Sequence, residues 1–137
     1  MADNSQRLGI LTDPVYMLHN PGIWHPESPQ RLAAVDDAID SLTFDTIPIA
    51  ARPATRDDLL LVHTADYVDA ILALKVRENM ALDPDTVISQ HTQEAALKAA
   101  GGVLEAVDQV LAHNIDCAFC AVRPPGHHAE PDRPMGF

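Results

Sequence analysis

One segment, Asp116–Val122, limits the possible folds more than any other part of the chain. Nearly all of its residues are β-branched, aromatic or small apolar ones, so a strand formed there is apolar on both faces. Strands of that kind belong in parallel sheets that helices cover on both sides. The segment therefore predicts an α/β fold with a mainly parallel sheet.

Helical and strand-like patterns alternate before that segment, and this order favours a three-layer α/β/α arrangement. Apolar residues recur at helical spacing in three stretches, and Thr55, with two aspartates close behind it, is expected to cap a further short helix. The longer helices are expected at Pro29–Leu42, Ala65–Asn79 and about Gln93–His113, the strands within Leu8–Leu18 and at Thr46–Ala50, and irregular segments at His19–Pro29 and Leu82–Gln90.

The last of these helices, which Thr92 is expected to cap, contains Gly101 and Gly102 in its middle. Each glycine lowers the stability of a helix by about 1 kcal/mol relative to alanine. Close packing against another backbone is the usual reason for such a pair. We therefore expect this helix to press against a neighbouring segment at the two glycines.

Composition excludes several classes of protein. The net charge of −11 argues against binding to nucleic-acid phosphates, which attract basic patches. It would tolerate a cationic partner such as a lysine-rich peptide or a polyamine, although solvation of the protein surface is the simpler explanation. No stretch approaches the length of a membrane span and no apolar signal core follows the start, so a cytoplasmic location is expected. Cys117 and Cys120 point to opposite faces of the expected strand and are predicted to be buried, inert thiols.

The residues best suited to chemistry follow the Asp116–Val122 strand. Residues 123–129 read RPPGHHA, so a stiff lead-in precedes His127 and His128. Active sites of open α/β sheets lie at the carboxyl ends of strands. A histidine pair held there can supply both a proton acceptor and a cationic stabiliser, which amide hydrolysis requires. The alternative of two ordinary surface histidines is disfavoured by the rigid lead-in.

Further motifs lie in order along the chain. They are HPESPQRL at 25–32, VHTADYV at 62–68, the acidic segment 83–89 followed by the alanine- and glycine-rich 95–102, and RPPGHHA with GF at 136–137. Together they resemble the histone deacetylase superfamily, particularly its class II and bacterial branch, which includes acetylpolyamine amidohydrolases. The resemblance implies an arginase/deacetylase-like α/β/α fold, with residues 1–137 forming the N-terminal portion of a single domain.

The resemblance also implies roles for the residues at the end of the chain. His128 would be the main general base and acid, and His127 would act mostly as electrostatic support. Gly136 and Phe137 would line the narrow tunnel that receives the acetyl-lysine stem, with Phe137 as one aromatic wall. The implied reaction is zinc-dependent removal of acetyl or other acyl groups from lysine side chains or polyamine-like amines.

Roles are implied for four earlier residues as well. Asp85, or a neighbour, would be the rim carboxylate that accepts hydrogen bonds from the backbone amides of an acetylated peptide. Arg31 resembles a buried arginine linked to the internal cavity through which acetate leaves. His25 and Glu27 are expected to anchor their loop. An acetylated lysine peptide and an acetylpolyamine-type small molecule both remain open as substrates.

The family's Zn²⁺ ligands, an Asp-x-His pair and a further aspartate, would follow Phe137, as would the tyrosine that assists the oxyanion. The chain alone is therefore expected to bind no catalytic zinc and to show no deacetylase activity. The other histidines are expected to be ordinary loop or helix-surface residues; they are His19, His63, His91 and His113.

Two alternatives to an incomplete amidohydrolase stay open. The chain could be a non-catalytic binding or assembly module, or it could be half of an enzyme that a second polypeptide completes. The resemblance also implies that the sheet of the parent fold is cut through, which would leave the Asp116–Val122 strand with an open apolar flank, and such edges favour self-association.

Overall fold

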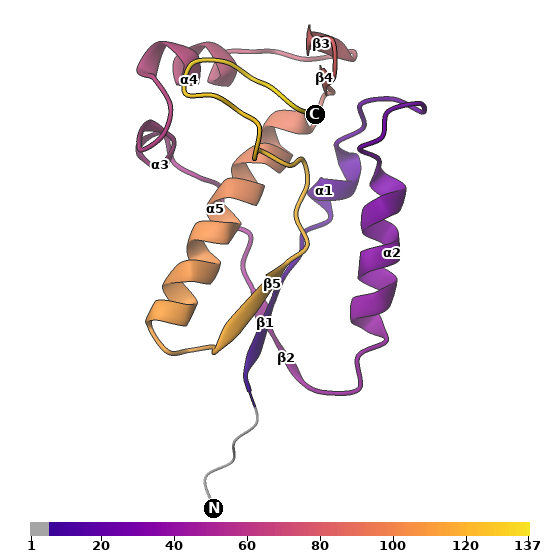
Figure 1. Cartoon of the computed structure of the whole chain (residues 1–137), viewed down its shortest axis with the longest axis vertical. Coiled ribbons are helices and arrows are strands. Elements are labelled where there is room, and N and C mark those ends of the chain that lie inside the picture. Colours follow the sequence, from indigo (N-terminus) through magenta and orange to yellow (C-terminus); the bar gives the residue numbers. More distant parts are fainter. Residues whose placement is uncertain (1–5) are drawn as a thin grey trace, which may run out of the picture.

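The computed structural model of this chain describes residues 6–137, and the first five residues, where no apolar signal core was expected to follow, lie outside the described part. The elements in chain order are β1 (Leu8–Leu11), α1 (Val15–Leu18), α2 (Pro29–Asp40), β2 (Thr46–Ile49), α3 (Arg56–Leu60), α4 (Ala65–Leu72), β3 (Met80–Asp83), β4 (Thr86–Ile88), α5 (Thr92–Leu111) and β5 (Cys117–Cys120). Three parallel strands form the main sheet in the order β2-β1-β5. Helices α2 and α5 lie on opposite sides of this sheet (Figure 1), so the predicted three-layer α/β/α fold is confirmed.

The central strand β1 supplies much of the core. Leu11 is fully buried and packs with Ile49 of β2, Ile115 and Ala106 of α5. Gly9 makes room for this cluster, because a Cβ at Gly9 would lie 2.6 Å from Cδ1 of Ile115 and 2.7 Å from Cδ1 of Ile49. The apolar side chains of three elements therefore meet over β1 and fix the position of α5 on the sheet.

Helix α5 presses against its neighbours at the two glycines, as predicted. A Cβ on Gly101 would lie 2.3 Å from both the carbonyl oxygen of Arg52 and the backbone nitrogen of Ala54. A Cβ on Gly102 would lie 2.8 Å from Cδ2 of Leu11.

Although α5 is 20 residues long, no helix within residues 6–137 combines the length and apolar character that crossing a membrane requires.

The starts of two helices test the expected caps. At α3 the prediction is confirmed, because the amide of Asp58 donates to Oγ1 of Thr55 at 3.1 Å and the amide of Thr55 donates to the Asp58 carboxylate at 2.8 Å. At α5 the prediction is wrong by one residue. His91 occupies the cap position, and Thr92 is the first helical residue.

Two segments differ from the expectation because side chains bond to the backbone there. Helix α4 ends at Leu72 rather than Asn79. At this end the Gln93 side chain donates hydrogen bonds to the carbonyl oxygens of Ile71 and Leu72 at 3.0 Å each. The expected loop at 82–90 contains most of a short antiparallel hairpin, β3 and β4. Its turn forms because Oδ1 of Asp83 accepts hydrogen bonds from the amides of residues 85 and 86.

Strand β5 is much more exposed than its apolar sequence predicts. It pairs with β1 and forms one edge of the sheet within residues 6–137. Phe119 is 48% exposed, Cys117 is exposed and Cys120 is partly buried. The prediction of two buried thiols is therefore wrong for Cys117, because no further layer covers this edge among the described residues.

Candidate functional site

His127 and His128 lie in the segment that leaves the carboxyl end of β5 and runs to the end of the chain (Figure 1). Their ring centroids are 4.2 Å apart and the two rings are tilted by 48°. Both side chains are exposed. The structure thus brings the two imidazoles together in the segment that follows the carboxyl end of β5, as expected, and both rings are open to solvent.

Gly136 lies directly against His128. Its φ angle is +72°, a left-handed conformation that favours glycine. A Cβ on Gly136 would lie 2.4 Å from the Cβ of His128 and 2.7 Å from its Cδ2. Close backbone approach and the left-handed turn therefore both require glycine here, and the backbone of residue 136 supports one side of the His128 imidazole.

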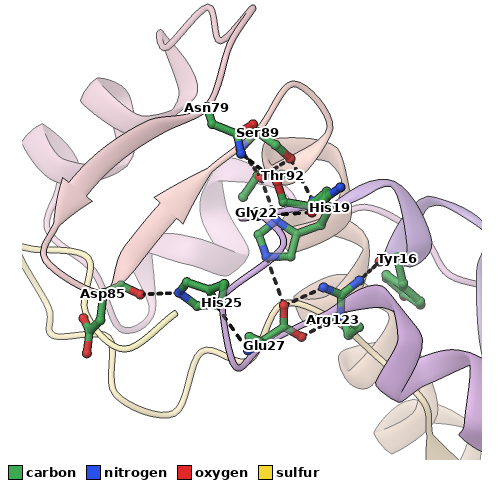
Figure 2. Close-up of polar contacts among 11 residues, drawn as sticks. Tyr16, His19, Gly22, His25, Glu27, Asn79, Asp85, Ser89, Thr92 and Arg123 are labelled. Atoms are coloured by element: carbon green, nitrogen blue, oxygen red, sulfur yellow. Dashed lines mark hydrogen bonds and ion pairs between the residues drawn. The ribbon is translucent and has the colours of Figure 1, made fainter.

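Phe137 and Asp85 lie together around the loop that contains His25. The Phe137 ring meets the His25 ring edge to face, with centroids 5.0 Å apart and an interplanar angle of 81°. The Nε2 atom of His25 is 2.9 Å from the carbonyl oxygen of Asp85, while the Asp85 carboxylate points away from this contact (Figure 2). His25 therefore holds the β3–β4 turn beside Phe137, as expected of a loop anchor.

These residues border a shallow cleft of about 540 Å³. Its wall also includes Ile23 and Trp24, and the Trp24 side chain is 92% exposed. Among the described residues, the cleft is lined by Phe137 and Asp85 but by neither histidine of the pair. Two of the predicted substrate-binding residues thus lie together, and Gly136, which precedes Phe137 in the chain, packs against His128.

The segment that carries the histidines is held against the start of α4, a contact that the sequence pattern does not predict. The amide of Thr64 donates to the carbonyl oxygen of Pro131 at 2.8 Å. The Nδ1 atom of His63 lies 3.1 Å from the carbonyl oxygen of Glu130, and its ring meets Tyr67 edge to face. His63 is therefore a half-buried contact residue rather than an ordinary surface histidine.

Arg31 does not have the buried position that the resemblance implies. It is exposed near the start of α2, whereas the next residue, Leu32, is 4% exposed. Consecutive residues on a helix point about 100° apart, so one faces the core and the other faces solvent. Among residues 6–137 the buried arginine is Arg123, for which the sequence pattern predicts no separate role.

Arg123 forms a buried ion pair with Glu27, far away in sequence (Figure 2). Glu27 is 2% exposed, and its two carboxylate oxygens accept from Nε and Nη2 of Arg123 at 2.5 and 2.6 Å. Burial raises the pKa of Glu27, but the contacts with His19 and Arg123 outweigh it and lower the pKa to about 2. Glu27 is therefore an anionic anchor of its loop, which agrees with the prediction.

His19 completes this buried group, so the prediction of a surface histidine is wrong. Its side chain is 1% exposed and its Nε2 atom is 3.2 Å from the Glu27 carboxylate, although the approach lies outside hydrogen-bond geometry. Its Nδ1 atom is 2.7 Å from Oγ1 of Thr92, which also accepts from the amide of Ser89. His19 follows the buried Val15 and Tyr16, and its contacts with Glu27 and Thr92 explain why a polar side chain is buried there.

No group of three or more His, Cys, Asp or Glu side chains within residues 6–137 is arranged to hold a metal ion. The side chains near His127 and His128 therefore do not fit a zinc site by themselves. What the described arrangement offers is a pair of solvent-accessible bases, a glycine that supports one of them, and a cleft lined by aromatic residues and Asp85.

Comparison with known proteins gives the family that the sequence motifs resemble, along most of the chain. The family model described as histone deacetylase domain matches residues 25–137. The chain is 39% identical over 112 residues to the histone deacetylase-like amidohydrolase of Pseudomonas aeruginosa, covering 82% of this chain and 29% of that protein. It is 32% identical over 149 residues to histone deacetylase 5 of Arabidopsis thaliana, covering all of this chain and 23% of that protein.

A solved structure extends the likeness to the fold. The crystal structure of the HDA15 HD domain superposes with a TM-score of 0.89 at 29% sequence identity, over 97% of this chain and 40% of that one. The chain thus spans between about a quarter and two fifths of the proteins that it matches here.

Proposed function

Because the chain belongs to the histone deacetylase family, we propose that it supplies the acid–base residues of a deacetylase that hydrolyses acetylated amines. One observation carries the proposal. His127 and His128 lie together where the chain leaves a parallel strand, and Gly136 packs against His128. Such a site can accept a proton from an attacking water and return it to the leaving amine.

In this proposal the two histidines have different tasks. His128, which Gly136 contacts, takes the proton from water and then protonates the amine as the amide bond breaks. His127 lies beside it and stabilises the developing negative charge as a cation. A positioned general base of this kind contributes roughly 10²- to 10⁴-fold to a rate.

The proposed substrate is an acylated primary amine on a slender alkyl stem, as in an acetylated lysine peptide or an acetylpolyamine. The cleft beside Phe137 and Asp85 supports this choice, because Trp24 and Phe137 give it aromatic surface and the acidic residue Asp85 lies in its wall. The net charge of −11 also favours cationic molecules over anionic ones. Asp85 is the residue proposed to accept hydrogen bonds from the substrate at the rim.

Zinc dependence is part of the proposal on the strength of the family alone. The described residues hold no cluster of metal ligands, so we assign no step of the reaction to a metal held by them. A catalytic zinc would need ligands other than those described here. The chain's own part in the reaction is to place the two imidazoles and one side of the substrate cleft.

A chimera tests the proposal. Residues 25–137 would replace the matching segment of the Pseudomonas aeruginosa amidohydrolase, and release of acetate would be measured from an acetyl-lysine peptide and from an acetylated polyamine. We expect hydrolysis that a chelator abolishes and Zn²⁺ restores, with the preferred substrate showing which amine is used. A chimera that unfolds cooperatively like the parent enzyme but hydrolyses neither substrate would contradict the proposal.

We also propose that the open edge at β5 supports self-association. Phe119 on this strand is 48% exposed, and Val107 and Leu111 of the neighbouring α5 are 49% and 71% exposed. Exposed strand edges and apolar surface favour pairing with another chain. Light scattering of the purified 137-residue chain should show dimers or larger species, and a clean monomer would contradict this expectation.

A further inference from the structure

The side chain of Arg123 turns inward at the point where the chain leaves the sheet. It is 4% exposed, and all three of its guanidinium nitrogens donate hydrogen bonds. Two go to the Glu27 carboxylate, and Nη1 donates to the carbonyl oxygen of Tyr16 at 2.5 Å (Figure 2). The planar, bidentate geometry fixes the orientation of the guanidinium as well as its distance.

The partner carboxylate is itself held from a second direction. Glu27 lies just before α2, and Nε2 of His19 is 3.2 Å from its Oε2 atom. On the other side of the imidazole, Nδ1 contacts Thr92 at the first turn of α5. The His19 imidazole thus lies between the Glu27 carboxylate and the Thr92 hydroxyl. Arg123 is thereby connected to both helical layers.

Only three residues separate Arg123 from His127, and two of them are Pro124 and Pro125. Proline fixes its own φ angle near −65° and restricts the residue before it. The chain therefore has little conformational freedom between Arg123 and His127, so the backbone direction at Arg123 largely determines where the histidines lie. Gly126, at which an added Cβ would meet no atom within 4 Å, is the one permissive position in between.

An ion pair this deeply buried is a poor device for stability alone. Removing two charges from water costs several kcal/mol per ion, and replacing such a pair by apolar side chains of similar volume is often neutral or stabilising. What an apolar pair cannot reproduce is the directional, three-pronged hold on Arg123 by Glu27 and Tyr16. Geometry is therefore the property that this ion pair contributes.

We propose that Glu27 and Arg123 are positioning residues for the histidine pair. Their ion pair sets the direction in which the chain leaves β5, and thereby where the imidazoles of His127 and His128 point. This inference rests on the proposed function for the catalytic use of the histidines. Its structural content, an orientation imposed across 96 residues of sequence, can be tested without any catalysis.

The competing explanation is that the ion pair only holds α2 and the sheet together. The double variant E27M/R123M separates the two, because it removes the charges and the fork while keeping apolar volume in the core. A matched control is R7M/D116M, which removes the exposed ion pair near the other end of β5. Each protein is the full 137-residue chain, and cooperative unfolding in urea establishes that it is folded.

Two measurements on these proteins report on orientation. Histidine-selective ¹⁵N NMR resolves the imidazoles of His127 and His128, and hydrogen exchange reports on the backbone amides of residues 126–129. In E27M/R123M we expect both imidazole signals to move or broaden and the amides to exchange about tenfold faster. The His113 signal should not change, and R7M/D116M should resemble the wild type at residues 126–129.

A folded E27M/R123M protein with wild-type imidazole signals and wild-type exchange at residues 126–129 would overturn the inference. Should that variant fail to unfold cooperatively, R123K takes its place, since lysine keeps the charge but cannot form the fork. A positioning role predicts altered signals from His127 and His128 in R123K as well, and unchanged signals would overturn the inference. Because neither readout needs turnover, failure of the proposed deacetylase activity would leave both results interpretable.

Discussion

The substitution Gly136→Ala would place a methyl group where the backbone faces His128. The new Cβ would lie 2.4 Å from the Cβ of His128, 2.8 Å from its Cγ and 2.7 Å from its Cδ2. Carbon atoms attract best at roughly 3.5–4.0 Å, so one of the two groups must move by about 1 Å. His128 is exposed and can swing into solvent without opening the core.

The effects on stability and on geometry should therefore separate. Gly136 has φ +72°, and a residue with a Cβ pays about 1–2 kcal/mol in that region. In a chain of this size such a loss lowers Tm by roughly 3–8 °C. Displacement of a catalytic group by about 1 Å can lower a rate by about 100-fold. We expect a folded protein in which His128 is misplaced.

Two other glycines provide matched controls. Gly22 also has a positive φ, +124°, but a Cβ there would have no atom within 4 Å. G22A therefore reports the cost of backbone strain alone. Gly126 is next to the histidine pair and has neither a positive φ nor a close neighbour, so G126A reports the effect of an added methyl group alone.

Thermal unfolding and histidine-selective NMR of the three variants give the answer. G136A should shift the imidazole signals of His128, whereas G22A should lower Tm without shifting them and G126A should do neither. If G136A leaves the His128 signals at their wild-type positions, the described packing is wrong. If G136A abolishes folding, the argument that the exposed imidazole yields without damage to the core is refuted.

Two further predictions concern stability. G101A gains about 1 kcal/mol of helix propensity, but its Cβ would lie 2.3 Å from the backbone oxygen of Arg52, so we expect the free energy of unfolding in urea to fall by about 2 kcal/mol or more. G102A, whose Cβ would meet a leucine side chain, should lose less. A stabilised G101A would contradict the described packing. The pKa of Glu27 falls from 4.5 in the unfolded chain to about 2 in the folded chain, so its contribution to the free energy of unfolding is present above pH 4.5 and is lost as the pH falls towards 2. The free energy of unfolding of E27M/R123M in urea should therefore decrease less steeply than that of the wild type between pH 4.5 and 2. An unchanged pH dependence would count against the ion pair.

The parts of the fold that follow from local pattern could be predicted from the sequence. Asp116–Val122 indicates a parallel strand because its side chains are apolar on both faces, and β5 pairs in parallel with β1. The pair of glycines in α5 indicates close backbone packing, which is found at Arg52. Each of these features depends on residues that are near one another in the chain.

Features that depend on a distant partner could not be predicted. The sequence offers Arg31 and Arg123 as equally polar residues, and only the folded chain shows that Arg123 meets Glu27, 96 positions away, while Arg31 faces solvent. The burial of His19 depends in the same way on Thr92. The hairpin of β3 and β4 was missed although its turn is local, because the Asp83 side chain that bonds to the amides of residues 85 and 86 belongs to an Asp-Pro-Asp sequence that is equally typical of an irregular loop.

The central claim is that His128 is the acid–base group of a deacetylase, with His127 in support. Steady-state kinetics of the amidohydrolase chimera, with H128A, H127A and the distant H113A compared on an acetyl-lysine peptide, test it most directly. We expect kcat to fall by about 10²- to 10⁴-fold in H128A, by less in H127A, and to stay unchanged in H113A, with KM little affected throughout. A folded H128A chimera that retains the kcat of the unmutated chimera would contradict the claim.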